Sequence, residues 1–330
     1  MIEILRAGRL NSVQDLGRHG FRHMGVCQSG ALDSTALSVA NRLVGNPCNA
    51  AGLEFTFGPC ILRFTADTRI ALTGADFDAT LDQRPVSPWW SVPVRAGQSI
   101  QLQGPRTGMR AYLAVAGGID VEVQLGARAT DLQAGFGGHA GRALRDGDRL
   151  AIDSSVRSSG QNAAAIRTAP AFGIRPPDWY QGGNTETISV RVIPGPEYAQ
   201  FSSAAQKTFW NSGWTLTPHS NRMGFRLAGP ELKINKNKDL PSHGVVPGVI
   251  QVPPAGQPIV LMAEAQTTGG YPKIGVVIQA DLPRLAQLRI NRTLQFVICD
   301  RAQALTALQE NARFLQLLDN AMRWLQAAKK

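Results

Sequence analysis

Apolar residues along this chain gather in short runs separated by glycine and proline, and long helical periods are few. The clearest runs of strand type are Leu53–Phe57, Cys60–Phe64, Arg69–Thr73, Met109–Val115, Thr187–Ile193 and Thr293–Cys299. Short strands at close spacing are typical of β-barrels and β-sandwiches, whereas a doubly wound sheet needs helices between its strands. The pattern therefore predicts a mainly β fold.

Helical periodicity appears in three places. Asp33 is a candidate N-cap for a helix that ends at a Gly-Asn-Pro turn, residues 45–47. A second helix is expected over Tyr198–Trp210. The last runs from about Ala302 to Ala328, where leucine, phenylalanine and methionine form one apolar stripe. The expected fold class is therefore β with a few helices, one of them at the C-terminus.

The chain has 330 residues, a length that suggests more than one domain. Between Ser154 and Thr187 the apolar period disappears and polar residues, glycine and proline take over, which is typical of a linker. We therefore expect an N-terminal β-barrel-like domain over residues 1–160 and a linker over 161–186. A second barrel domain would follow over 187–301, with the C-terminal helix over 302–330.

Composition narrows the class of protein. Hydrophobic residues make up 43% of the chain and charged residues 18%, as in ordinary soluble globular proteins. No run approaches the roughly 18 apolar residues of a membrane span, and the first residues contain no signal-peptide core. The four cysteines form no C-x-x-C pair. We therefore expect a cytoplasmic protein with neither a metal site nor a disulfide.

The formal net charge of +10 raises the question of nucleic acid. The arginines are spread singly along the chain, and the densest basic stretch, Lys233–Lys238, has no aromatic residues between its lysines. We therefore expect neither nucleic-acid nor membrane binding. A basic surface that attracts an anionic substrate or an acidic partner fits the distribution better.

Common catalytic motifs are absent. The sequence contains neither G-x-x-x-x-G-K-[ST], which cradles nucleotide phosphates, nor the hydrolase motif G-x-S-x-G. Gly135–Ala140 matches a loose G-x-G-x-x-A, but Gly147 interrupts the chain before any long helix can follow. That stretch is therefore predicted to connect two strands.

Four polar segments punctuated by glycine stand out: Ser12–Asn46, Tyr112–Asp120, Ser220–Gly224 and Gln266–Gly275. The first leads to the N-terminus of the helix expected after Asp33, where backbone N–H groups favour an anion. In the last, Q-T-T-G-G-Y-P-K-I-G, two hydroxyls, an amide and two glycine N–H groups follow a strand. A turn explains any single glycine, but the whole run indicates a loop that binds a polar ligand.

Together these segments resemble the biotin-dependent carboxyltransferase family, also called allophanate hydrolase subunit 2 or KipA-like proteins. The motifs that carry the resemblance are S-V-Q-D-L-G-R, S-G-A-L-D, A-N-R-L-V-G-N, L-A-V-A-G-G-I-D, S-N-R-M-G and Q-T-T-G-G-Y-P-K-I-G. The resemblance runs from about Leu10 to Ala302. The family includes the carboxyltransferase domain of urea carboxylase and one subunit type, the C subunit, of bacterial ATP-dependent 5-oxoprolinase.

The resemblance implies tandem β-barrel domains of cyclophilin-like type. It also implies work within an assembly that contains KipI-like and LamB/YcsF-like partner subunits. Its most specific form implies ATP-dependent hydrolysis of 5-oxoproline to glutamate, with ATP shared with one of these partners. Two alternatives stay open: a biotin-dependent carboxyltransferase acting on urea or a similar amide, and a non-catalytic regulatory subunit. The chain has no M-K-M biotinylation site, so no covalent biotin is expected on it.

The resemblance also implies a set of site residues. Candidates for catalysis are Asp15, Asp33, Glu54, Arg222 and Lys273. Candidates for substrate binding are Gln14, Arg18, Asn41, Gln266, Thr267, Thr268, Gly269, Gly270 and Tyr271. The two catalytic cations would stabilise phosphate or carboxylate charge, and one of the three carboxylates would act as acid or base. Turn caps and salt bridges are the structural alternatives for each carboxylate.

Two positions depart from the family's pattern. Glu264 stands where an aspartate is common before the Q-T-T-G-G-Y loop, which keeps the acid but makes it one methylene longer. Arg289–Arg292 replaces a frequent Pro-Gly turn. Within it, Asn291 is expected to tolerate a positive φ, because asparagine enters the left-handed region more readily than most residues.

Overall fold

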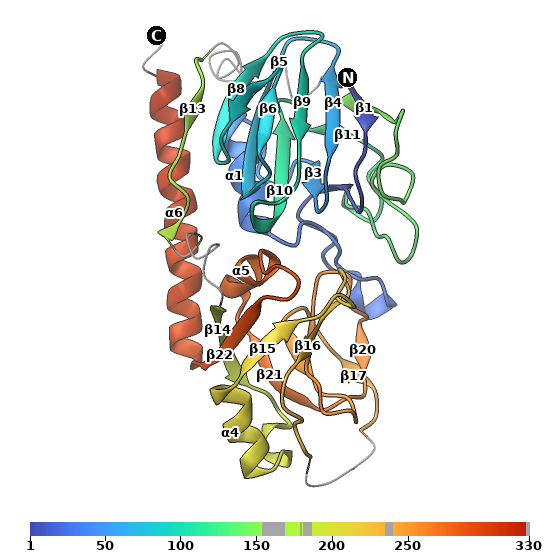
Figure 1. The fold of residues 1–330 in the computed structure, drawn as a ribbon, viewed down its shortest axis with the longest axis vertical. Helices are drawn as coiled ribbons and strands as arrows, with labels where there is room; N and C mark the ends of the chain where they lie inside the picture. Colours follow the sequence, from blue (N-terminus) through green and yellow to red (C-terminus); the bar gives the residue numbers. More distant parts are fainter. Residues whose placement is uncertain (154–168, 179, 181–186, 235–239, 328–330) are drawn as a thin grey trace. The chain divides into compact units, whose positions relative to one another are not determined.

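The computed structural model describes residues 1–153, 169–178, 180, 187–234 and 240–327 (Figure 1). The chain divides into two compact units. Unit 1 comprises Met1–Arg18, Ser29–Gln181 and Arg313–Lys330, and unit 2 comprises His19–Gln28 and Gly182–Ala312. Most of the linker expected over 161–186 lies outside the described residues. The short segment His19–Gln28 belongs to unit 2 although both of its neighbours in sequence belong to unit 1.

Unit 1 contains two sheets. The seven-stranded sheet has the order β11 (Ile119–Asp120), β12 (Arg149–Ile152), β1 (Ile2–Arg6), β4 (Cys60–Phe64), β9 (Ser99–Leu102), β6 (Ala79–Leu81) and β7 (Arg84–Val86). The six-stranded sheet has the order β13 (Phe172–Gly173), β8 (Trp90–Val94), β5 (Thr68–Asp76), β10 (Thr107–Val115), β3 (Gly52–Phe55) and β2 (Ser12–Gln14). Apolar side chains of both sheets form one core cluster.

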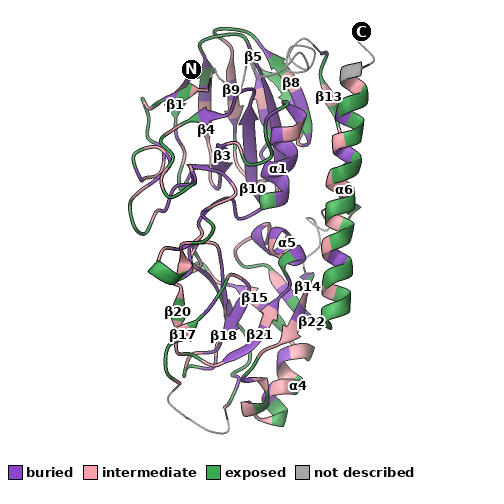
Figure 2. Ribbon diagram, turned by 180° about the vertical axis from the view of Figure 1, so that it is seen from behind, coloured by how far each residue is buried: buried purple, intermediate pink, exposed green. Residues whose placement is uncertain are grey.

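Strands β5 and β10 form the buried centre of unit 1, and Figure 2 shows both of them buried over most of their length. One face contributes to the core shared by the two sheets. On the other face, Ala71 and Tyr112 join a cluster with helix α1 (Ser34–Leu43) and with Leu318 of helix α6 (Arg301–Ala327). A strand covered on both faces is apolar at nearly every position, which explains the apolar run at Ala111–Val115.

Helix α1 begins where the sequence predicts. The Asp33 carboxylate accepts a hydrogen bond from the Ala36 N–H at 2.9 Å, as an N-cap should. The helix ends before Gly45, which takes a left-handed φ of 77°. The cap also fixes the segment just before the helix, which belongs to the polar loops of unit 1.

Unit 2 is a closed barrel. Its strands run in the order β14 (Thr187–Pro194), β21 (Lys273–Val277), β18 (Val249–Gln251), β19 (Ile259–Leu261), β16 (Gly224–Ala228), β15 (Gly213–Leu216) and β22 (Thr293–Ile298). The first and last strands pair in parallel, from Thr187↔Thr293 to Val192↔Ile298, which closes the barrel. A separate two-stranded sheet joins β17 (His243–Gly244) to β20 (Thr268–Gly269).

The helical segments of unit 2 are short. The helix expected over Tyr198–Trp210 is two elements, a 3-10 turn η3 (Tyr198–Gln200) and helix α4 (Ser203–Asn211), because Ser202 caps a new start through a 3.0 Å bond from the Ala205 N–H. Three further elements were not expected: η1 (Arg22–Met24), η4 (Gln279–Asp281) and α5 (Leu282–Ala286). In α4, Phe209 stacks on Phe296 of β22 with ring centroids 4.6 Å apart.

The predicted fold class is confirmed, since the described residues are mostly β and carry helix α6 near the C-terminal end. The closed barrel is unit 2, while the strands of unit 1 form two sheets. Asn291 does take a positive φ, of 64°, as expected for the turn that replaces Pro-Gly. Among the described helices, none is both long and apolar enough to cross a membrane.

One polar contact should control the acid stability of unit 1. Asp148 accepts two hydrogen bonds from the Arg142 guanidinium, each of 2.8 Å, and one from the Arg145 N–H. The bond from Arg142 is the main cause that lowers the pKa of Asp148 to about 2. A carboxyl group with a lowered folded-state pKa stabilises the protein above its unfolded pKa of roughly 4, and this stabilisation is lost as the pH falls toward 2.

We therefore expect Asp148→Asn to lower the stability of unit 1 at pH 7 by about 1.5–3 kcal/mol, the range for charged hydrogen bonds. The difference from the wild type should shrink between about pH 4 and pH 2. Thermal unfolding at a series of pH values measures this. Asp67→Asn is the matched control, because that exposed carboxylate accepts a backbone bond from Ala96 and no bond from a cation is recorded for it among the described residues. A pH-independent difference for Asp148→Asn would contradict the expectation.

Candidate functional site

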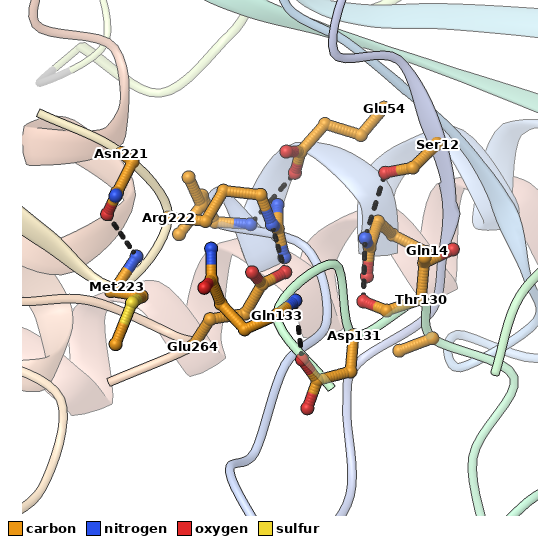
Figure 3. Close-up of polar contacts among 12 residues, drawn as sticks. Ser12, Gln14, Glu54, Thr130, Asp131, Gln133, Asn221, Arg222, Met223 and Glu264 are labelled. Carbon is orange, nitrogen blue, oxygen red and sulfur yellow. Dashed lines mark hydrogen bonds and ion pairs between the residues drawn. The ribbon is translucent and has the colours of Figure 1, made fainter. Parts of the chain in front are cut away.

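The first polar loop of unit 1 begins where β2 ends. Gln14 is fully buried, and its amide Nε2 donates to Ser12 Oγ at 2.9 Å and to the Thr130 carbonyl at 3.2 Å (Figure 3). Its Oε1 is buried without a hydrogen-bond partner among the described residues. A buried acceptor without a donor is uncommon in folded proteins, and Gln14 therefore stays a candidate for substrate binding.

Asp15 and Arg18 connect this loop to the part of the chain around residue 129. Asp15 accepts hydrogen bonds from the Gly17 N–H at 2.7 Å and from the Arg128 N–H at 2.5 Å. The Arg18 guanidinium donates to the Ala129 carbonyl at 2.6 Å and lies over the Phe136 ring, 4.3 Å from its centroid. These contacts favour the structural alternative for Asp15, because both of its oxygens are engaged by backbone N–H groups.

A buried polar network centred on Tyr112 joins two of the candidate carboxylates. Burial, followed by the charges of Glu54 and Asp33, raises the pKa of Tyr112 well above its usual value. The hydroxyl therefore stays protonated, donates to Glu54 Oε2 at 2.7 Å and accepts from the Asp33 N–H at 2.9 Å. Glu54 also accepts from the Leu32 N–H at 3.0 Å, and its other oxygen lies 3.8 Å from Arg110 Nε.

This network holds the S-G-A-L-D turn in place. The N–H groups of Leu32 and Asp33 are bound by Glu54 and Tyr112, while the Ala31 N–H donates to the Asp15 carbonyl at 2.8 Å. Asp33 caps α1 with one oxygen, and its other oxygen accepts from the Tyr180 hydroxyl. These contacts favour the structural alternative for Asp33 and Glu54 that the sequence left open, and a catalytic role for either stays a prediction.

Asn41 also has structural partners. Its amide nitrogen donates to the carbonyls of Cys48 and Ala50, at 3.3 and 2.8 Å, and its oxygen accepts from Asn46 at 3.0 Å. Asn46 in turn donates to the Val115 carbonyl at 2.8 Å. The motif A-N-R-L-V-G-N thus ties the end of α1 to the end of β10. The predicted role of Asn41 in substrate binding finds no support in these contacts.

In unit 2, Arg222 and Glu264 form a buried ion pair, with Arg222 Nε 2.5 Å from Glu264 Oε1 (Figure 3). The two backbones pair as well, since the Glu264 N–H donates to the Arg222 carbonyl at 3.0 Å. Asn221 shapes the S-N-R-M-G turn by accepting from the Met223 N–H at 2.9 Å. The longer acid at position 264 therefore has a definite partner, and Arg222 already has a counter-charge.

The loop Gln266–Gly270 is held at several points. The Arg22 guanidinium donates to the carbonyls of Val245 and Gln266, at 2.5 and 3.3 Å, and the Val245 N–H donates to the Thr267 carbonyl at 2.9 Å. Thr268 and Gly269 pair with β17. Thr268 is exposed and Tyr271 is 47% exposed, so both side chains are accessible from solvent within this unit.

The two glycines of this loop are needed for close approach and not for a left-handed backbone, since positive φ occurs at neither. A Cβ at Gly269 would lie 2.5 Å from Gln251 Nε2, and one at Gly270 would lie 3.0 Å from the Leu240 carbonyl oxygen. Real Cβ atoms hardly ever come so close to other atoms. The loop therefore packs tightly on Gln251, which the sequence did not single out.

Lys273 starts strand β21 and is buried, with 4% of its surface exposed. Its Nζ lies 3.1 Å from Glu197 Oε2, and the same oxygen accepts the Lys273 N–H at 3.0 Å. Across the ladder, Lys273 pairs with Gln251 of β18. Sequence reasoning missed four residues of these sites: Arg22, Tyr112, Glu197 and Gln251. Arg22 and Tyr112 lie within two of the polar segments noted in the sequence, Ser12–Asn46 and Tyr112–Asp120, whereas Glu197 and Gln251 lie outside all four. In each case only contacts with residues distant in sequence identify the residue.

The described residues contain no group of three or more histidine, cysteine, aspartate or glutamate side chains that could hold a metal ion. What they offer instead is two polar regions, one in each unit. In unit 1, Asp15, Arg18 and Asp33 lie in the chain between β2 and α1, while Gln14 ends β2 and Glu54 lies in β3. Hydrogen bonds from the Leu32 N–H to Glu54 and from the Ala31 N–H to the Asp15 carbonyl connect these parts. In unit 2, Gln266–Gly270 adjoins Gln251 and, through it, Lys273.

Comparison with known proteins agrees with this architecture. Residues 24–298 match the family model described as carboxyltransferase domain, subdomain A and B, and the chain belongs to this family. It is 48% identical over 318 residues to the C subunit of 5-oxoprolinase from Escherichia coli (strain K12), covering 96% of this chain and 97% of that protein. The identity to the C subunit of 5-oxoprolinase from Haemophilus influenzae is 38%, covering 96% of each.

A solved structure is similar as well. The crystal structure of the Kluyveromyces lactis urea carboxylase matches with a TM-score of 0.85 and 28% sequence identity, over 96% of this chain and 29% of that one. The family resemblance expected from the sequence motifs is thus confirmed.

The buried pair in unit 2 yields a stability prediction. Glu264→Gln should destabilise unit 2 by about 3–5 kcal/mol, because it leaves the buried Arg222 cation without its counter-charge. Replacing both residues, as Arg222→Met with Glu264→Leu, should recover part of this loss. Urea unfolding of the purified chain measures both. Asp78→Asn, which breaks the exposed Arg106–Asp78 pair, is the control and should cost less than about 1 kcal/mol. An equally small effect of Glu264→Gln would mean that the pair contributes little.

The tight packing of the loop yields a second prediction. Gly269→Val should displace the Gln251 amide and reduce the activity of the assembled protein about 5- to 150-fold, because the roughly 1–3 kcal/mol that overpacking costs would fall on the binding loop itself. Thr268→Val, of similar size at an exposed neighbour, should leave the packing on Gln251 unchanged. Steady-state rates with melting curves test the pair of variants. Full activity in a well-folded Gly269→Val protein would mean that the loop is only a turn.

Proposed function

We propose that this chain is one component of an ATP-dependent 5-oxoprolinase complex, which hydrolyses 5-oxoproline to L-glutamate. The observation that carries the proposal is the near full-length similarity to two proteins named as the C subunit of 5-oxoprolinase. The chain acts with KipI-like and LamB/YcsF-like partner subunits. The four cysteines are free thiols, which fits a reducing cytoplasm.

The reaction requires that a stable lactam be opened. ATP supplies the activation: transfer of its terminal phosphoryl group to the lactam carbonyl oxygen releases ADP and activates that carbon toward water. Water adds to the carbon and the C–N bond breaks, which leaves the amine and an acyl phosphate, and a second water then hydrolyses the acyl phosphate to glutamate and phosphate. The residues of this chain hold and orient the substrate. In unit 2 the hydroxyls, amides and N–H groups of Gln266–Gly270 orient the ring, and Lys273 attracts its carboxylate.

The electrostatics of unit 2 favour a nucleotide held mainly by another chain of the complex. Arg222 is paired with Glu264 and Lys273 with Glu197, so the two catalytic cations expected from the sequence already carry counter-charges. A triphosphate needs several cations or backbone donors directed at it. If ATP is shared with a partner subunit, that subunit supplies the cations and donors that the triphosphate needs. A chain without a phosphate-binding motif can then belong to an ATP-dependent enzyme.

A carboxyltransferase acting on urea or a similar amide is the second candidate, favoured by the similarity to the Kluyveromyces lactis urea carboxylase. That chain is much longer, and the match covers 29% of it. The same polar loop could orient an amide in place of a lactam. The two candidates differ in their second substrate, which is ATP with water in one case and carboxybiotin in the other.

We expect the purified chain alone to release no glutamate from 5-oxoproline, and the complex with the KipI-like and LamB/YcsF-like subunits to do so only with ATP. The physical reason is that this chain contributes substrate contacts but no self-contained nucleotide site. A coupled glutamate assay, with each component omitted in turn, measures this. Turnover by the chain alone would contradict the expectation. Carboxyl transfer from carboxybiotin to urea, without glutamate release, would establish the second candidate, and neither activity would indicate a regulatory role.

A further inference from the structure

Two buried donor groups of unit 2 make no recorded hydrogen bond within the described residues. Gln251 is 2% exposed, and its Nε2 has no hydrogen-bond partner among the described residues. Lys273 is 4% exposed, and its Nζ also makes no hydrogen bond there, although Glu197 Oε2 lies at ion-pair distance. Buried donors are nearly always satisfied in folded proteins, and each unsatisfied one costs roughly 1–3 kcal/mol.

The ladder between β18 and β21 brings the two side chains to the same place. Gln251 and Lys273 are register partners, and partners in an antiparallel pair project to the same face of the sheet. Gln251 also contacts the Q-T-T-G-G loop, because its Oε1 accepts from Gln266 Nε2 at 3.4 Å and its Nε2 abuts Gly269. The two donors therefore lie directly beneath the loop proposed to hold the substrate.

The segment that lies over these donors is short. Gly269 has no side chain, and the ladder that secures it, β17 with β20, is only two residue pairs long. Thr268, next to it, is exposed. For a ligand to reach Gln251 and Lys273, this short segment has to move. The movement breaks the bonds from Arg22 to the Gln266 carbonyl and from Val245 to the Thr267 carbonyl, but none between the barrel strands.

The charges around the donors suit a ligand with one negative charge. Lys273 is offset by Glu197, and Gln251 and Gln266 are neutral. Arg22 adds a positive charge, since the recorded bonds of its guanidinium within the described residues go to the neutral carbonyls of Val245 and Gln266. These groups sum to +1, which matches a carboxylate; a phosphate with about two charges would remain undercompensated.

We propose that Gln251 and Lys273 form the binding site for the carboxylate of a small ligand. Glu197 is the positioning residue that holds the Lys273 ammonium. The proposal rests on the function proposed above and identifies the group of 5-oxoproline that this part of the loop recognises. The ligand's carboxylate accepts from the Gln251 amide on one oxygen and from the Lys273 ammonium on the other. The lactam ring then lies against the Gln266–Gly270 segment.

The test compares Gln251→Glu, which keeps the shape but turns a donor into an acceptor, with Gln257→Glu as a matched control. Gln257 makes a similar pair of amide bonds, with the Gly229 N–H and carbonyl at 3.0 and 3.1 Å, in the turn between β18 and β19. Both variants lose one amide donor. Only Gln251→Glu should alter ligand binding. Melting curves of both variants show whether a change in binding is accompanied by a loss of stability.

Calorimetry on the assembled complex uses 5-oxoproline and 2-pyrrolidinone, the same lactam without the carboxylate. We expect Gln251→Glu and Lys273→Met to weaken 5-oxoproline about 10- to 150-fold and raise its KM, as charged hydrogen bonds of roughly 1.5–3 kcal/mol predict. Binding of 2-pyrrolidinone should change less than about twofold, and Gln257→Glu should change neither. Unchanged 5-oxoproline affinity in folded Gln251→Glu, or equal losses for both ligands, would overturn the proposal.

The experiments distinguish an error in the proposed function from an error in the proposed carboxylate-binding site. If the wild-type complex does not hydrolyse 5-oxoproline, acetate binding to the full chain provides the readout. If the wild type binds acetate and both Gln251→Glu and Lys273→Met abolish this binding, the result supports the carboxylate-binding site independently of the reaction. Acetate binding that neither variant changes, or no binding to the wild type at concentrations of tens of millimolar, would overturn it.

Discussion

The parallel pairing of β14 with β22 is the constraint on which unit 2 depends. It joins two strands from opposite ends of the unit's sequence over six consecutive residue pairs, from Thr187↔Thr293 to Val192↔Ile298, and so leaves the barrel without an open edge. A slip of one residue would turn every inward side chain outward. Leu294 and Phe296 are buried while Gln295 between them is exposed, and Phe296 stacks on Phe209 of α4. The packing of these apolar side chains therefore fixes the register.

Closure in turn fixes the polar loops. With β14 in register, β21 is fixed beside it and β18 beside β21, and a shift of register between Ile250 and Gln251 then brings Gln251 opposite Lys273. The segments around Arg222 and Glu264 are positioned by β16 and β19 in the same way. Precision at a binding loop thus comes from strands whose register is set by apolar residues far from it. The barrel thus supplies the rigid scaffold, and the loop it carries is held by further bonds from Arg22, Val245 and β17.

The sequence predicts elements whose signals are local. The Asp33 cap, the strand at Cys60–Phe64 and the positive φ of Asn291 all follow from neighbouring residues, and all are present. The sequence does not predict which polar residues of a motif bind a ligand and which support the fold, because a buried asparagine and a ligand-binding asparagine look alike in one chain. Asn41 uses its amide nitrogen on two carbonyls and its oxygen on Asn46, which only the folded structure reveals. Gln251 is the opposite case: it sits in an ordinary strand, and its unsatisfied donor appears only when its neighbours are known.

The way charges are distributed in unit 2 connects its structure to an assembly. Burying a cation is costly unless a counter-charge accompanies it, and Arg222 with Glu264 and Lys273 with Glu197 meet that requirement. Each pair also removes a cation from the set available to a highly charged ligand. Arg22 is then the cation near the loop whose recorded partners are neutral carbonyls, so this region of the described chain has a net charge suited to a monoanion. The reaction proposed above passes through a phosphorylated carbonyl and needs more positive charge than that, which is why the proposal assigns the nucleotide mainly to a second protein chain.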